Sequence, residues 1–346
     1  SALSRLSQFN GFIFSWSPRG GQYSKHVTID GINWESKLSG WNSSFSYAGL
    51  YKSFKLVGSL VHNESSTVGF GYNGTTQLLS SNATQFKKAI IIGTSFSNSS
   101  YLNEGHLQWS SGKLKKGWFF HSNFIFQETP LGLLPNGFKK NRGLLLSAEK
   151  QLKNEHLLGF TFFWDINNQG KVSPSVKEAY TISKQRNYNP GWGWYKGAAV
   201  YPNSKLNNAP QFLFRHEKKW KERAIINSAL AIVIGNQQQS SLDWTNTFDP
   251  RPDYYKYLPT YIKDSTLNEA LLQYFEQHPN ALQLNFDQFE KVNQANSQKR
   301  SFYIINASVA QLSLIRASSQ LKYSINNFWN GSMGVEFAKD HIHYYN

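Results

Sequence analysis

Three carboxylates lie close together in the second half of the chain, and carboxylate oxygens are ligands that Ca²⁺ takes in proteins. Asp243 precedes a run at residues 249–259 (DPRPDYYKYLP) that contributes Asp249 and Asp253. A calcium loop places its ligands at alternate positions and bends at a glycine. Here Arg251 stands between the two carboxylates, and the run contains no glycine. The pattern therefore favours an Asp–Arg ion pair that stiffens a loop over a metal site.

The histidines form no recognisable catalytic or metal-binding pattern. His341 and His343 would share one face of a strand, but no further ligand accompanies them, and His106, His121 and His216 are isolated. The chain has no cysteine, which excludes thiol catalysis, iron–sulfur clusters and Cys-ligated zinc. It also lacks a phosphate-binding loop or dinucleotide fingerprint. We therefore expect neither an enzyme nor a bound cofactor or metal.

Aromatic rings are concentrated in two segments. Within residues 188–197 (YNPGWGWYKG), three aromatic rings follow an Asn-Pro-Gly turn signal. Residues 243–259 contain several more rings. Rings in loops either pack against one another or offer a stacking surface for a sugar, a peptide or a base. Under the second alternative, the candidate ligand-binding or partner-binding residues are Trp192, Trp194, Tyr195, Trp244, Tyr254, Tyr255 and Tyr257.

Composition narrows the class of protein. Of the 346 residues, 16% are charged and 16% are aromatic. Such aromatic content excludes intrinsic disorder, and the low content of helix-forming residues excludes a coiled coil. The formal net charge is +15, but the basic residues form short clusters, as at residues 87–88 and 139–142, and no long run. We therefore do not expect nucleic-acid binding.

Apolar side chains recur at every second position in several segments. Between residues 156 and 165, for example, Leu158, Phe160, Phe162 and Trp164 share one face. This period of two indicates β-strands. The same alternation occurs in residues 117–127, 211–220, 224–235 and 333–338.

These predicted strands are about nine to twelve residues long, whereas strands of soluble proteins usually have about five or six. A tilted strand of about nine to eleven residues crosses a bilayer. Tight turns at residues 113–116 and 219–222 alternate with long loops at 167–209 and 240–298. Short turns on one side and long loops on the other are typical of outer-membrane barrels. A large soluble, carbohydrate-binding β protein is the alternative.

Other segments interrupt this pattern. We expect a helix at residues 266–276, with Ser265 as its N-cap, and a helical turn at residues 173–180. Residues 1–85 are rich in Gly and Ser and contain shorter strands, such as 26–29 and 67–70. They indicate a separate small domain.

Several of these segments resemble TonB-dependent outer-membrane receptors of the Bacteroidetes type. The later half of the plug domain of that family is similar to residues 18–21 (PRGG), 27–32 (VTIDGI), 38–41 (LSGW) and 47–50 (YAGL). The barrel and loops of the family are similar to residues 173–180, 188–193, 242–244, 249–259 and 284–293. The block at 249–259 is the most specific of these.

The resemblance implies an all-β fold, a transmembrane antiparallel β-barrel of about 22 strands with a plug domain in its lumen. It assigns residues 1–85 to the C-terminal part of the plug and 86–346 to the first ten to twelve barrel strands, about half of the barrel. An open barrel edge leaves unsatisfied backbone groups in lipid, so we expect a longer polypeptide. Arg19 and Asp30 are expected to hold the plug against the barrel through charged hydrogen bonds.

The implied function is energy-coupled uptake of a bulky nutrient, a glycan, a peptide or a chelate, across the bacterial outer membrane. The implied partners are the lipid bilayer of that membrane and a TonB-type energy-coupling protein, engaged by an N-terminal segment outside this sequence. The alternative is a barrel that transports nothing and serves as a scaffold in an outer-membrane complex. A surface-exposed lipoprotein or a secretion partner would then rest on its loops.

Overall fold

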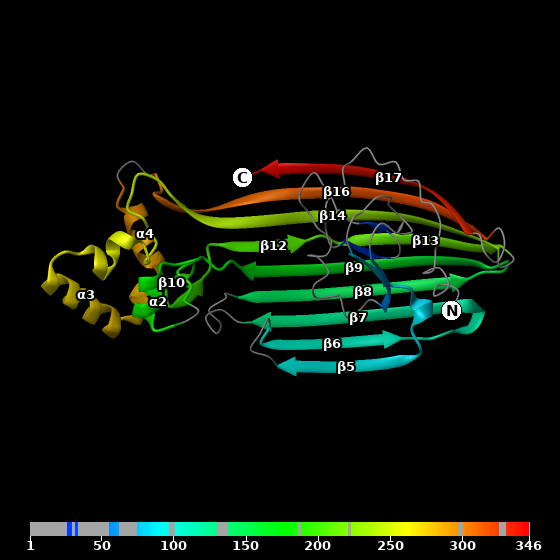
Figure 1. The fold of residues 1–346 in the computed structure, drawn as a ribbon, viewed down its shortest axis with the longest axis horizontal. Helices are drawn as coiled ribbons and strands as arrows, with labels where there is room; N and C mark the ends of the chain where they lie inside the picture. The colour runs from blue at the N-terminus through cyan, green and yellow to red at the C-terminus, as the bar shows by residue number, and fades with distance from the viewer. Residues whose placement is uncertain are drawn as a thin grey trace.

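A ten-stranded antiparallel sheet dominates the computed structural model (Figure 1). The structure describes residues 26–29, 32–33, 55–61, 75–96, 101–129, 138–185, 188–220, 223–296, 300–324 and 330–345. The sheet consists of β5 (Ala89–Phe96), β6 (Asn103–Ser110), β7 (Trp118–Thr129), β8 (Lys139–Gln151), β9 (His156–Gly170), β12 (Ser204–Asn208), β13 (Gln211–Trp220), β14 (Ala224–Trp244), β16 (Tyr303–Ser324) and β17 (Asn330–Tyr345). Apart from β12 and β13, which do not pair with each other, strands of this sheet that are consecutive in the chain are antiparallel neighbours, so the predicted antiparallel arrangement is confirmed.

β13 has the predicted bounds, whereas β9, β14 and β17 are longer than the sequence pattern predicted. β14 has 21 residues and β16 has 22. At about 3.3 Å per residue, β16 extends about 70 Å, which exceeds a bilayer core of about 30 Å even when the strand is tilted. Beyond its apolar stretch, β14 continues through the polar residues 236–241 (NQQQSS), which explains why apolar alternation predicted a shorter strand there.

β12 and β13 occupy one strand position between β9 and β14. Ala209 and Pro210 separate them, and the register against both neighbours is the same before and after the break. Proline has no N–H to donate to a neighbouring strand, so Pro210 interrupts the hydrogen bonding. The interruption is local, because β9 and β14 are the neighbouring strands on both sides of it.

The two faces of the sheet differ in composition. The outer face presents exposed apolar side chains: Ile90, Ile92, Leu107, Trp109, Phe124, Leu146, Leu158, Trp164, Phe214, Leu230, Ile234, Met333, Val335 and Phe337. The inner face carries a buried apolar cluster, which includes Ile125, Leu145, Phe163, Leu213, Val233 and Leu312. Buried polar side chains surround this cluster: His121, Asn123, Gln127, Asn141, Glu149, Thr161, Asp165, Asn167, Asn207, Gln211 and Arg316. An apolar outside and a polar inside are the expected faces of a membrane-spanning barrel wall.

A separate four-stranded sheet lies in the N-terminal part of the chain. It contains β1 (His26–Ile29), β2 (Ile32–Asn33), β3 (Lys55–Val61) and β4 (Thr75–Ser80), in the order β2-β1-β4-β3. β1 and β4 are parallel. The predicted strand at 26–29 is confirmed, whereas the one predicted at 67–70 falls outside the described residues.

The two long loops fold together at one end of the large sheet, on the left of Figure 1. Their regular elements are α2 (Lys177–Ser183), β10 (Gly193–Tyr195), β11 (Ala198–Val200), α3 (Ser265–Gln277), β15 (Leu284–Asn285) and α4 (Phe286–Gln294). We call this body, which consists of residues 171–185, 188–203, 245–296 and 300–302, the loop module. The described residues also contain short 3-10 turns: η3 (Ala83–Gln85), η4 (Lys115–Gly117), η5 (Tyr255–Tyr257), η6 (Pro259–Tyr261) and η7 (Pro279–Leu282).

The helix predicted at residues 266–276 is confirmed as α3, but its predicted cap is wrong. The N-cap is Asp264, whose carboxylate accepts hydrogen bonds from the backbone N–H groups of Thr266 and Leu267. A charged oxygen at this position also interacts favourably with the helix dipole. Within the described ranges, no helix is long and apolar enough to cross a membrane.

Candidate ligand-binding surface and inner-face anchor

A small core joins the two halves of the loop module. Tyr188 is 2% exposed, and its hydroxyl donates a hydrogen bond of 2.6 Å to the carbonyl oxygen of Leu282. Ala179, Leu258 and Phe275 are buried beside them. β10 also pairs in parallel with β15. The described parts of the two loops therefore form one packed body.

Three of the predicted site residues belong to β10 or flank it. The rings of Trp192 and Trp194 meet edge to face, with centroids 5.2 Å apart, and Trp192 stacks on Tyr201 at 5.9 Å. The ammonium of Lys196 lies 4.6 Å from the centre of the Tyr195 ring. All three predicted rings are half-buried. Part of their surface thus packs within the module, and part of it is exposed to solvent.

A second group of rings is more exposed. Tyr254 meets Tyr255 at 4.9 Å and Tyr257 at 5.2 Å, and Tyr255 meets Tyr261 at 5.4 Å, all edge to face. We call these four residues the tyrosine cluster. Tyr255, Tyr257 and Tyr261 are 51%, 37% and 52% exposed. Tyr261 was missed by the sequence analysis, because nothing in the pattern distinguishes it from other loop tyrosines.

The ion pair predicted beside this cluster is confirmed. Arg251 contacts the carboxylate of Asp249 at 2.6 Å through Nη2 and at 2.9 Å through Nε. Burial opposes ionisation of Asp249, but the hydrogen bonds and charge of Arg251 outweigh it and lower the pKa of that carboxyl below its usual value. The guanidinium also lies 5.6 Å from the Trp244 ring and 5.9 Å from that of Tyr254. Arg251 therefore fixes Trp244 beside the tyrosine cluster.

Metal binding finds no support in the geometry. In the part of the chain that the structure describes, no three His, Asp or Glu side chains gather closely enough to hold a metal ion. Asp249 forms an ion pair with Arg251, and Asp253 is buried.

The inner face of the sheet holds the segment that follows β4. We call residues 80–86 the anchor segment. The N–H of Thr84 donates to Glu149 on β8 at 2.7 Å, and the hydroxyls of Ser81 and Thr161 lie 3.0 Å apart. The ring of Phe86 stacks on His121 with centroids 3.7 Å apart. Three strands of the sheet thus contact a segment of seven residues.

A buried ion pair supports this anchor. Glu149 and Arg215, on strands separated by β9, are 3.1 Å apart, and their side chains are 1% and 12% exposed. Nη2 of Arg215 also donates to Thr161 at 3.2 Å. Strand alternation places Glu149 and Arg215 on the inner face, but their partners are too distant in sequence to be found by pattern. Arg19 and Asp30, proposed for the same role, lie outside the described residues.

The buried tyrosines of the loop module should make it less stable at alkaline pH. Burial raises the pKa of Tyr201 to about 12, and burial, with Asp253 and Tyr180 nearby, raises that of Tyr188. Tyrosine in an unfolded chain ionises near pH 10, so the folded state holds its proton more tightly. The stability from Tyr201 is complete below about pH 10 and is lost between about pH 10 and 12. Protease sensitivity of the loops in detergent-solubilised protein should increase over that window.

The Tyr201→Phe variant tests the cause of this loss of stability at alkaline pH, since phenylalanine keeps the ring and cannot ionise. Its loops should lose less protease resistance between pH 10 and 12 than those of the wild type, with little change at neutral pH. An equal loss in both proteins would show that Tyr201 does not contribute to the lower stability at alkaline pH.

Comparison with known proteins places this geometry in context. No family model and no curated protein matches the sequence. The structure is similar to the ferripyoverdine receptor of the outer membrane of Pseudomonas aeruginosa, with a TM-score of 0.52 and 10% identity over 92% of this chain and 36% of that one. A second structure of that receptor, bound to a heterologous pyoverdine, gives a TM-score of 0.52 and 12% identity over the same shares of the two chains.

The structure is also similar to the ferric-catecholate import receptor Fiu from E. coli, with a TM-score of 0.49 and 9% identity over 79% of this chain and 37% of that one. The chain spans about a third of the length of these proteins, 36–37%. At such low identity, the likeness to the ferripyoverdine receptor shows the fold, which is that of outer-membrane receptor barrels. The predicted fold class is thereby confirmed.

Proposed function

We propose that this chain, with the fold of outer-membrane receptor barrels, forms part of a TonB-dependent receptor that takes up a bulky ligand. Residues 1–85 would form the later part of a plug, and residues 86–346 the first half of a barrel of about 22 strands. A TonB-type energy-coupling protein would act through a segment outside this sequence. The ligand would be a glycan, a peptide or a chelate, and the ferric ligands of the similar structures make a chelate the first to test.

The observation that carries this proposal is the anchor segment on the inner face. A receptor that moves a ligand through a plugged barrel needs its plug tied to the wall at a defined place. Here the segment after β4 reaches the wall through Glu149, Thr161 and His121. At the other end of the large sheet, the loop module presents aromatic rings on loops that are already packed. Ligand binding would therefore cost little conformational entropy for ordering these loops.

The proposal is tested by uptake in cells that express the full-length protein in the outer membrane. A panel of radiolabelled ferric chelates, oligosaccharides and peptides is supplied with and without the TonB-type protein. We expect one class to accumulate only when the energy-coupling protein is present. Binding without accumulation would contradict transport and would support the scaffold alternative, in which the loops carry a surface-exposed lipoprotein.

The exposed tyrosines should dominate ligand affinity. The double variant Tyr255→Ala/Tyr257→Ala removes two rings of the tyrosine cluster but none of the module's buried core. Loss of an aromatic anchor typically costs about 2 kcal/mol or more, so we expect binding to weaken about 30-fold or more. Surface binding to intact cells provides the measurement. The matched control is Phe248→Ala, a ring that is 81% exposed in the same loop and outside the cluster.

The double variant Trp192→Ala/Trp194→Ala tests the other ring group. Because Trp192 stacks on Tyr201 and meets Trp194, this variant should loosen the loops as well as weaken binding. Unchanged binding together with normal barrel assembly would limit these two rings to packing.

A further inference from the structure

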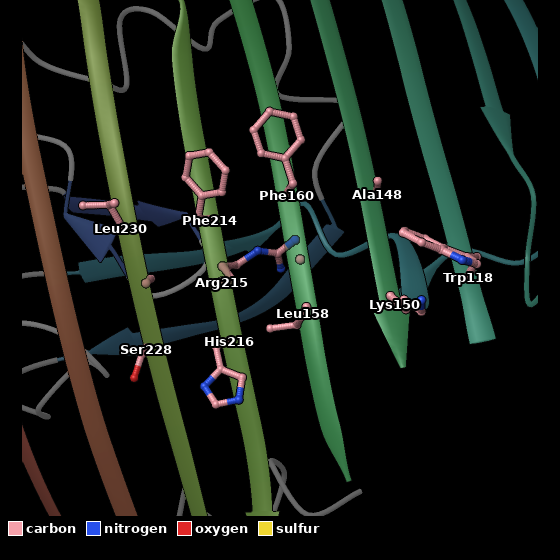
Figure 2. Close-up of a pocket in the computed structure, with 12 residues that line it drawn as sticks. Trp118, Ala148, Lys150, Leu158, Phe160, Phe214, Arg215, His216, Ser228 and Leu230 are labelled. Atoms are coloured by element: carbon pink, nitrogen blue, oxygen red, sulfur yellow. The ribbon is translucent and has the colours of Figure 1, made fainter. Parts of the chain in front are cut away.

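A hollow of about 700 Å³ lies on the outer face of the large sheet, at the end of the strands remote from the loop module. Figure 2 shows it crossing β7, β8, β9, β13 and β14. Two rows of cross-strand neighbours line it. The row nearer the middle of the strands contains Ala148, Phe160, Phe214 and Leu230; the row nearer their ends contains Trp118, Lys150, Leu158, His216 and Ser228.

Small residues among large ones create the hollow. Ala148 lies beside Phe160, and Ser228 beside His216. The rings of Phe160 and Phe214 are 5.0 Å apart and form an apolar surface along the strands. Phe214 is 46% exposed and Leu158 is 44% exposed. A hollow of this size and apolar lining fits a drug-sized ligand or part of a lipid.

Basic side chains lie at the end of the hollow and just beyond it: Lys150 lines the hollow, and Lys218 lies one row farther out. The ammonium of Lys150 lies 4.8 Å from the centre of the Trp118 ring, and that of Lys218 lies 4.3 Å from that of Trp220. His216 shares a hydrogen bond of 2.9 Å with His156, the cross-strand neighbour of Lys218. None of the twelve lining residues, all within the described part of the chain, is acidic. Cations that lie over aromatic rings at the border of an apolar belt are suited to lipid head groups.

We propose that this hollow binds one anionic phospholipid of the leaflet remote from the loop module. The phosphate would lie between Lys150 and Lys218, within reach of the His156–His216 pair, and an acyl chain would lie along Phe160, Phe214 and Ala148. The charge of the basic end selects an anionic head group, and the apolar rows continue into the outer face. The proposal requires only that this face meets lipid and is independent of ligand uptake.

The test uses the full-length protein purified in a neutral detergent and titrated with phosphatidylglycerol or phosphatidylcholine, with bound lipid counted by native mass spectrometry. The wild type should prefer phosphatidylglycerol. Lys150→Gln/Lys218→Gln should weaken its binding about tenfold or more. Ala148→Phe keeps both cations and fills the hollow, so it should weaken binding of the same lipid even if the first variant folds poorly.

The matched control is Lys140→Gln. This lysine lies on the outer face of β8 at the opposite end, where it pairs with Glu128 at 3.6 Å. It should bind phosphatidylglycerol like the wild type. Three results would overturn the proposal: no preference of the wild type between the two lipids, equal affinity of the double variant and the control, or equal competition by inorganic phosphate, which would mean that the acyl chain contributes nothing.

Discussion

Replacing Arg215 with alanine is expected to lower the free energy of unfolding by about 3–5 kcal/mol, because it leaves the buried carboxylate of Glu149 without its ion partner. The side chain of Glu149 is 1% exposed, so water cannot replace the guanidinium. The same carboxylate accepts the N–H of Thr84. The loss of stability should therefore affect the anchor segment as well as the large sheet.

Two measurements on the full-length protein in detergent check this prediction. Chemical unfolding gives the free energy, and hydrogen exchange at the amide of Thr84 reports the anchor, which should exchange faster in the variant. Lys219→Ala is the matched control on the same strand, since its pair with Glu217 is exposed and 3.4 Å long. Such a pair contributes about 0–1 kcal/mol. If the two variants lowered the free energy of unfolding equally, burial of the Glu149–Arg215 pair would contribute nothing to stability.

Replacing Gly193 with valine is expected to separate the two halves of the loop module while the sheet remains intact. A Cβ atom at this position would overlap the carbonyl oxygen of Leu284 on β15. Overpacking typically lowers the free energy of unfolding by about 1–3 kcal/mol. The overlap between the new side chain and Leu284 lies within the pairing of β10 with β15. Cleavage of the loops by an added protease should accelerate on intact cells, and ligand binding should fall with it.

The control for Gly193→Val is Ala198→Val on β11, the strand that pairs with β10. Ala198 is exposed, and a β-branched side chain is well accommodated in a strand. Surface substitutions of this kind change stability by about 0.5 kcal/mol or less. If both variants show the same protease resistance as the wild type, close approach of β10 and β15 is not what holds the loops together.

Much of the wall could be predicted from local pattern. Leu158, Phe160 and Phe162 alternate because one face of β9 is apolar and the other polar, and this signal lies within a few residues. α3 was predicted for the same reason, from apolar spacing. α4 was missed: it has only nine residues, and its cap, Asn285, is the second residue of a two-residue strand, β15, that pairs with β10. Its start is therefore set by a contact with a distant segment.

The anchor could not be predicted, because its contacts join residues far apart in sequence. Thr84 and Glu149 are separated by 65 positions, and Ser81 and Thr161 by 80. No period connects them, and only the register of β7, β8 and β9 brings their partners together. The Asp249–Arg251 pair is the contrasting case: its two members are two residues apart, so sequence spacing was enough to predict it.

The parallel pairing of β10 with β15 joins two segments that are separated in the chain by two passes of the large sheet. The two strands are joined by a chain that runs down the sheet through β12 and β13 and returns through β14. Lys196 and Asp287, which meet beside this pairing, are 91 residues apart. When both of these passes are in the sheet, the two segments return to the same end of it and meet in the closed loop module. On intact cells, a probe that recognises the closed module would therefore report chains in which these two distant segments have come together.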